Sequence, residues 1–167
     1  MSLNDQLQDA IEAIVSNVLS TVHTCIPGKI ESYDHTKQMA NVQPLIKKKY
    51  VDGETVNLPV IVNVPVVWMR GGGALFTFPL MQGDGVLLLF AERNIDLWLT
   101  KGGIVGPPDR RKFDLSDCIA IPGLVDFTNS NFPANNDDVM LTYSGGSFAV
   151  HNDGQIDINN GNLTVDV

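Results

Sequence analysis

Few side chains in the sequence have the types and spacing that catalysis or metal binding needs. His23 and Cys25 lie two positions apart, so they would share one face of a strand and could offer two ligands to zinc. A structural zinc site takes four ligands, and no second pair lies close in the sequence. Cys25 and Cys118 are far apart and form no CxxC pair. We therefore predict no metal site in this chain and treat both cysteines as buried free thiols.

Other motifs that could support catalysis are incomplete. Gly71-Gly72-Gly73 lacks the Lys-Ser/Thr of a phosphate loop, and no helical pattern follows it. No GxSxG motif marks a nucleophile, and Glu92 and Asp96 are separated by Arg93, which favours a solvated turn. The sequence predicts no enzyme activity and no cofactor in this chain.

The charge of the chain excludes several kinds of partner. Its 167 residues carry a formal net charge of -8 at pH 7, which disfavours nucleic acid and anionic lipid surfaces. Lys47-Lys48-Lys49 is the only basic run, and only Tyr50 beside it could stack on a base. We therefore interpret it as a loop, or as a contact with an acidic neighbour, and not as a nucleic-acid site. The start is acidic where a signal peptide is basic, and no apolar run is long enough to span a membrane. We expect synthesis in a cytosol and no transmembrane segment.

Residues 1–22 are predicted to form an amphipathic helix. An apolar stripe recurs at helical spacing: Leu7, Ile11, Ile14 and Val18. Ser2 can cap the first turn. No later segment has a helical pattern of this strength. The stripe is therefore expected to pack on the β domain of its own chain, or on copies of the chain or a neighbouring protein.

Residues 23–125 are predicted to form a small β-barrel. Short strands separated by Gly and Pro turns indicate a barrel or sandwich, and about five strands over this length suit the OB type. The expected strands are Thr24–Asp34, Gln38–Lys47, Val60–Val67, Ala74–Phe78, Val86–Ala91 and Ile119–Ile121. Val86 to Phe90 is apolar at every position, so we expect that strand to be buried on both faces.

Residues 126–138 are rich in Asn and Asp and are predicted to be an exposed linker. In residues 139–167, apolar side chains then alternate with polar ones between turn clusters. The alternating positions are Phe148, Val150, Ile156, Ile158, Leu163, Val165 and Val167. Each is worth about 1.5–3 kcal/mol when buried, but an isolated ribbon cannot bury them. The helix and this strand array therefore both indicate assembly with other chains.

Three blocks carry a family resemblance: TCIPGKIESYDHTKQMANVQPLI, LPVIVNVPVVWMRGGGALFTFPLMQGDGVLLLFAERNIDLWL and RRKFDLSDCIAIPGL. In order and spacing they resemble the N-terminal domain of the central spike proteins of contractile-tailed phages, the membrane-piercing proteins of the Mu-like type. The resemblance covers about Thr24 to Leu124. It implies an OB-fold-like barrel that forms a homotrimer, followed by an intertwined triple-stranded β-helix, the needle, which would start in residues 139–167.

The resemblance also implies a function and a place. The protein would be a structural component at the tip of the virion tail baseplate, made in the host cytoplasm, with hub and tail-tube proteins as partners. The N-terminal helix would meet the hub, and the alternating apolar side chains would face the threefold axis. The needle would pierce the host envelope when the sheath contracts, which needs no catalytic residue.

Needles of this family typically end in a His-x-His apex that holds iron, and this chain has no His-x-His. The apolar alternation also continues to Val167 without a closing turn. We therefore expect either further chain and an iron-bearing apex beyond Val167, or a separate tip protein.

Three alternatives stay open. The first is an OB-fold module that binds an oligosaccharide or nucleic acid, although the acidic charge and the 7% aromatic content disfavour it. The second is a cell-wall hydrolase, for which no pair of acidic residues in a helical domain is present. The third is the spike of a contractile bacteriocin or a related injection machine, which the sequence does not distinguish from a phage spike.

Overall fold

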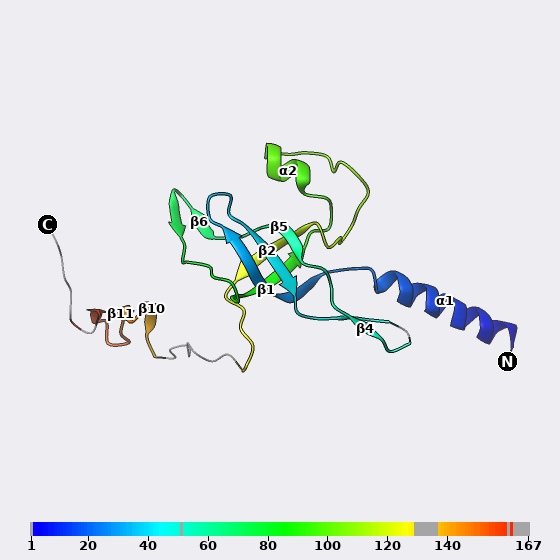
Figure 1. Cartoon of the computed structure of the whole chain (residues 1–167), viewed down its shortest axis with the longest axis horizontal. Coiled ribbons are helices and arrows are strands. Elements are labelled where there is room, and N and C mark those ends of the chain that lie inside the picture. The colour runs from blue at the N-terminus through cyan, green and yellow to red at the C-terminus, as the bar shows by residue number, and fades with distance from the viewer. Residues whose placement is uncertain (1, 51, 129–136, 160, 162–167) are drawn as a thin grey trace. The chain divides into compact units, whose positions relative to one another are not determined.

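The computed structural model describes residues 2–50, 52–128, 137–159 and 161. The chain divides into two compact units, Met1–Val125 and Asp126–Val167, and Figure 1 shows their elements. The first unit contains α1 (Leu3–Leu19), β1 (Cys25–Asp34), β2 (Met39–Pro44), β3 (Lys48–Lys49), β4 (Thr55–Val56), β5 (Ile61–Pro65), β6 (Met69–Gly71), β7 (Ala74–Phe76), β8 (Gly85–Phe90), α2 (Asp96–Lys101) and β9 (Cys118–Pro122). The second contains β10 (Val139–Tyr143), β11 (Gly146–Val150) and β12 (Ile156–Ile158).

Five strands of the first unit form one curled sheet, the half-barrel, in the order β5-β2-β1-β8-β9 (Figure 1). All four pairings are antiparallel, and the register of β1 shifts between Ile30 and Ser32, where a bulge bends the strand. A parallel bridge joins Val66, just after β5, to Ala120 of β9. The Val67 N–H donates to the Ala120 carbonyl at 2.9 Å. The two edge strands of the sheet therefore meet at this bridge.

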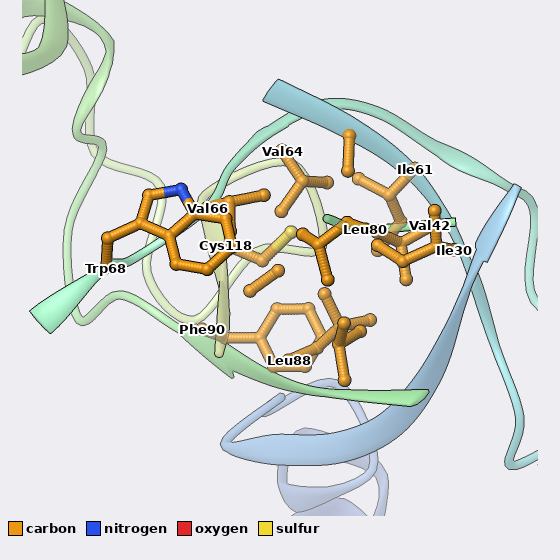
Figure 2. Packing of buried hydrophobic residues seen from close by; sticks show 13 residues of the cluster. Ile30, Val42, Ile61, Val64, Val66, Trp68, Leu80, Leu88, Phe90 and Cys118 are labelled. Carbon is orange, nitrogen blue, oxygen red and sulfur yellow. The ribbon is translucent and has the colours of Figure 1, made fainter. Parts of the chain in front are cut away.

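The inside of the half-barrel holds one cluster of apolar side chains (Figure 2). Ile30 of β1, Val42 of β2 and Leu88 of β8 are completely buried, and Figure 2 shows their side chains directed into the shared core. Full burial of an aliphatic side chain contributes about 1.5–3 kcal/mol. The half-barrel can therefore be stabilised by its own core.

The predicted mainly β fold with an N-terminal helix is confirmed, and each of the six expected strands overlaps an observed strand. The expectation that Val86 to Phe90 is buried on both faces was wrong. Val86, Leu88 and Phe90 are buried, but Leu87 and Leu89 between them are only half-buried. An antiparallel sheet commonly leaves one face partly open to water, and this strand does so despite its apolar sequence.

Helix α2 was not predicted, because six residues carry no helical period and its N-cap, Ile95, makes no side-chain bond. Polar contacts hold the segment instead. The Arg111 guanidinium donates to Asp96 at 3.0 Å, to Asp109 at 2.9 Å and to Ser116 at 2.6 Å. Burial raises the pKa of Asp117, while the Ile95 N–H that it accepts opposes that rise. Arg111 thus ties both ends of the loop around α2 together.

Gly28 of β1 is packed closely against core side chains, and this packing generates a prediction. A Cβ at Gly28 would lie 2.7 Å from Val42 Cγ1 and 3.1 Å from Leu88 Cδ1, both in the core. We expect Gly28→Ala to lower the free energy of unfolding by about 1–3 kcal/mol, because an overpacked core must shift. Denaturant unfolding measures the change. In the control Gly71→Ala, the new Cβ meets nothing within 4 Å, and a loss of equal size there would contradict the packing account.

Candidate functional site

Strands β10, β11 and β12 form a three-stranded antiparallel sheet, the meander. Its first turn, Ser144-Gly145, has positive φ at both positions, as in a type I′ hairpin. Leu141 pairs with Phe148, which pairs with Ile158, and Val139 pairs with Val150, which pairs with Ile156. Directly paired residues point to the same side of a sheet. These side chains therefore share one side, the meander face: Val139, Leu141, Phe148, Val150, Ile156 and Ile158.

The meander face is largely open to solvent. Ile156 is 66% exposed, and Phe148 and Ile158 are each 37% exposed. The opposite side carries Met140, which is 40% exposed, the polar side chains of Thr142, Ser147 and Asp157, and buried Ala149. A sheet of this size needs a covered apolar side for independent stability, so the meander face has the character of an assembly surface.

The alternating positions singled out in the sequence are only partly described by the structure. It places Phe148, Val150, Ile156 and Ile158 on the meander face, while Leu163, Val165 and Val167 lie outside the described residues. Sequence reasoning missed Val139 and Leu141, although they follow the same alternation. Within one chain the strands form an antiparallel meander, and the expected intertwined β-helix is not shown.

Polar contacts fix the edge of the meander. The Nδ1 of His151 lies 3.2 Å from Asp138 Oδ2, and the Asn152 N–H donates to Asp138 Oδ1 at 3.2 Å. The His151 N–H donates to the Gln155 carbonyl at 2.9 Å. Asp138, the residue before β10, is thus joined to the turn between β11 and β12. These contacts help to set the register of the apolar pairs.

Helix α1 presents a second apolar surface, the α1 stripe, made of Leu7, Ile11, Ile14 and Val18. No residue of α1 is buried, and Ile11 and Ile14 are 52% and 64% exposed. At 100° per residue, the acidic side chains Asp5, Asp9 and Glu12 fall on the other side of the helix. The α1 stripe is therefore uncharged and is not buried against the half-barrel of its own chain.

The structure also places the histidine and the cysteines that the sequence analysis considered as metal ligands. His23 packs against Phe90, with ring centroids 5.4 Å apart, and burial lowers its pKa. Burial raises the pKa of Cys118 to about 12, whereas Cys25 is exposed, contrary to our expectation, because it starts β1 at the sheet end. Across the described ranges, no group of three or more His, Cys, Asp or Glu side chains is placed to hold a metal ion. No helix in those ranges is long and apolar enough to cross a membrane.

Comparison with known proteins identifies a sequence family. Residues 26–123 match the family described as Phage protein Gp138 N-terminal domain. The match begins in β1 and ends just after β9, so it covers the half-barrel and more than half of the chain's 167 residues. No curated protein matches the chain.

The start of α1 generates a prediction about how the α1 stripe is presented. Ser2 Oγ accepts the Asp5 N–H at 3.2 Å, and the Ser2 N–H donates to Asp5 Oδ2 at 2.8 Å. We expect Ser2→Ala to cost the helix about 1 kcal/mol, seen as faster amide exchange in its first turns. The control is Ser16→Ala, in the last turn of the helix and far from this cap, which should not weaken the first turns.

The same cap should depend on pH. The Ser2 N–H lowers the pKa of Asp5 below its usual 3.8. The bond therefore stabilises the folded helix above that value, and its contribution is lost as the pH falls through the lowered pKa. Protection factors in the first turns of α1, which correct for the intrinsic pH dependence of exchange, should fall in both cases. Protection that stays unchanged in Ser2→Ala, or on acidification through this range, would contradict the capping box.

Proposed function

Because the chain belongs to the family of phage proteins with the Gp138 N-terminal domain, we propose that it is a central spike protein of a contractile tail. Family membership indicates a structural component of a phage, associated with the virion. The finer assignment is that three copies sit on the axis at the tip of the tail baseplate. There they would pierce the host envelope when the sheath contracts.

The exposed meander face is the observation that carries this proposal. Its apolar pairs, such as Phe148 with Ile158, cannot be buried by a three-stranded sheet alone. In a homotrimer, three meander faces turn inward to a common axis, and the sides with Thr142 and Asp157 face water. Burial of each large side chain then contributes about 1.5–3 kcal/mol, and the three chains also cover one another's sheet edges.

The topology of the half-barrel supports the OB-like part of the assignment. Five strands in the order β5-β2-β1-β8-β9, with a parallel bridge between the segment after β5 and β9, fit a small, partly open Greek-key barrel of the OB type. Such a barrel keeps its own core. It can therefore act as a rigid base for a trimeric rod.

The proposed mechanism is mechanical. Sheath contraction supplies the energy, and the spike transmits force along its axis, so this chain performs no catalytic step and binds no cofactor. The α1 stripe is the surface by which the trimer meets hub or tail-tube proteins. Its uncharged character suits a contact with another apolar protein surface. The helix lacks the basic side chains with which interfacial helices bind anionic membranes.

The first prediction of the proposal concerns the trimer axis. The wild-type protein should have three times the 18.2 kDa chain mass in light scattering. Ile158→Asp would bring three carboxylates to the axis, where unpaired buried charge is costly, so we expect the trimer to dissociate at lower protein concentration. The control is Thr142→Asp, which adds the same charge on the opposite side of the meander. A monomeric wild type, or equal behaviour of the two variants, would refute the axial placement.

The second prediction concerns the α1 stripe. Ile14→Asp places a charge in the stripe, whereas Ser16→Asp places the same charge on the acidic side of the helix. We expect only Ile14→Asp, like deletion of residues 1–20, to reduce the amount of this protein in purified tails, with the half-barrel still folded. Quantitative immunoblotting measures incorporation. Normal incorporation of Ile14→Asp and of the deleted form would rule out a hub contact through the stripe.

A further inference from the structure

A cleft in the first unit lies beside the turn between β1 and β2, and the spike function does not use it. It encloses about 480 Å³, within the range of about 300–1,000 Å³ that is typical of small-molecule sites. Buried Leu80 contributes to its lining. The side chains that carry the argument are Tyr33, His35, Gln38, Trp68, Thr77 and Phe78.

The aromatic part of the lining is held in place before any ligand arrives. The Trp68 indole N–H donates to the Tyr33 hydroxyl at 3.3 Å. The rings of Trp68 and Phe78 meet edge to face, with centroids 4.9 Å apart. Trp68 is buried at one edge of the core cluster (Figure 2), while Phe78 is 40% exposed. A fixed indole therefore supports an exposed phenyl ring, and both line the cleft.

Polar side chains surround these rings. The Tyr33 hydroxyl accepts from Trp68, so its own proton is available to a ligand. Among the described residues, none makes a hydrogen bond to the side chains of His35, Gln38 or Thr77, so each of these can donate to or accept from a bound molecule. Several groups able to donate or accept hydrogen bonds thus line the same cleft.

Gln38, at the end of the turn between β1 and β2, has an unusual backbone conformation. Its φ is 56°, in the left-handed region that costs a non-glycine residue about 1–3 kcal/mol. The Gln38 carbonyl accepts the Val66 N–H at 2.9 Å, which holds the residue there. The turn between β1 and β2 thus holds Gln38 in one backbone conformation at the lining of the cleft.

We propose that this cleft binds a neutral saccharide. A sugar ring offers an apolar C–H side to Phe78 and hydroxyl groups to Tyr33, Gln38 and Thr77. No Asp, Glu, Lys or Arg lines the cleft, and the net charge of -8 disfavours a polyanion. In OB-type barrels the loop between the first two strands takes part in oligosaccharide binding, and the β1–β2 turn holds that position here. The ligand class goes beyond the proposed mechanical function and does not depend on a trimer.

The chain offers its own fluorescent reporter for a binding test. It has two tryptophans, and Trp98 is exposed on α2, so Trp98→Phe leaves Trp68 as the only indole. We expect this protein to show a saturable change in fluorescence with chitotriose or maltotriose, with a dissociation constant of about 1 mM, as a few hydrogen bonds and one stacking contact allow. Saturation-transfer NMR on the wild-type protein provides a second readout. Binding of chitotriose alone assigns N-acetylated cell-wall sugars, and binding of maltotriose assigns hexose polysaccharides.

Matched variants place the binding in the cleft. Phe78→Ala and Thr77→Val, each in the Trp98→Phe protein, should weaken binding at least about tenfold and threefold, since a ring contact and a hydroxyl bond are lost. Leu75→Ala is the control, because Leu75 is 53% exposed and is not part of the lining. Thr77→Val keeps the side-chain shape, so it decides the matter if Phe78→Ala does not fold. Failure of both sugars to bind, or binding that both cleft variants leave unchanged, would overturn the proposal.

Discussion

The meander is a three-stranded sheet whose apolar side, the meander face, is left exposed within its own unit. Ala149 is buried on the side with Thr142 and Asp157, whereas Ile156 and its neighbours on the meander face are exposed. The hydrophobic effect acts on this exposed area whatever the chemistry of the partner. The proposed assembly follows from that constraint, because three identical chains supply three identical apolar faces and need no other partner to bury them.

The half-barrel, unlike the meander, buries its apolar side chains within one chain. Its core of Ile30, Val42 and Leu88 is complete within one chain, and the Val66–Ala120 bridge joins its edges. Polar contacts of Arg111 fix the loop around α2. A unit with a complete core of its own can belong to a chain with exposed apolar surfaces, namely the α1 stripe and the meander face. It can also hold a cleft, whose rings are set by the hydrogen bond between Trp68 and Tyr33.

The sequence predicted those elements whose apolar period is long or is bounded by clear turns. Helix α1 and the six expected strands belong to this class. It could not predict α2, because six residues held by Arg111 have no period of their own. It also misjudged β8, since an all-apolar strand does not reveal that its second side stays half open.

The candidate surfaces were likewise predicted only in part from the sequence. Alternation selected Phe148 and Ile158 as residues of one face, but only the register between β11 and β12 places them opposite each other. Tyr33, Trp68 and Phe78 come from distant parts of the chain, so no spacing in the sequence brings them together. Contacts between segments that are far apart in the sequence form both the meander face and the cleft, and a local sequence pattern does not predict such contacts.

The central claim is that the meander face is buried on a threefold axis. An electron cryomicroscopy reconstruction of the tail tip, refined without imposed symmetry, tests it most directly. The account predicts three copies of this chain around the tail axis, with Phe148, Ile156 and Ile158 of each copy turned inward and the side of Thr142 outward. Another number of copies, or a meander face turned to solvent or to a different protein, would contradict it.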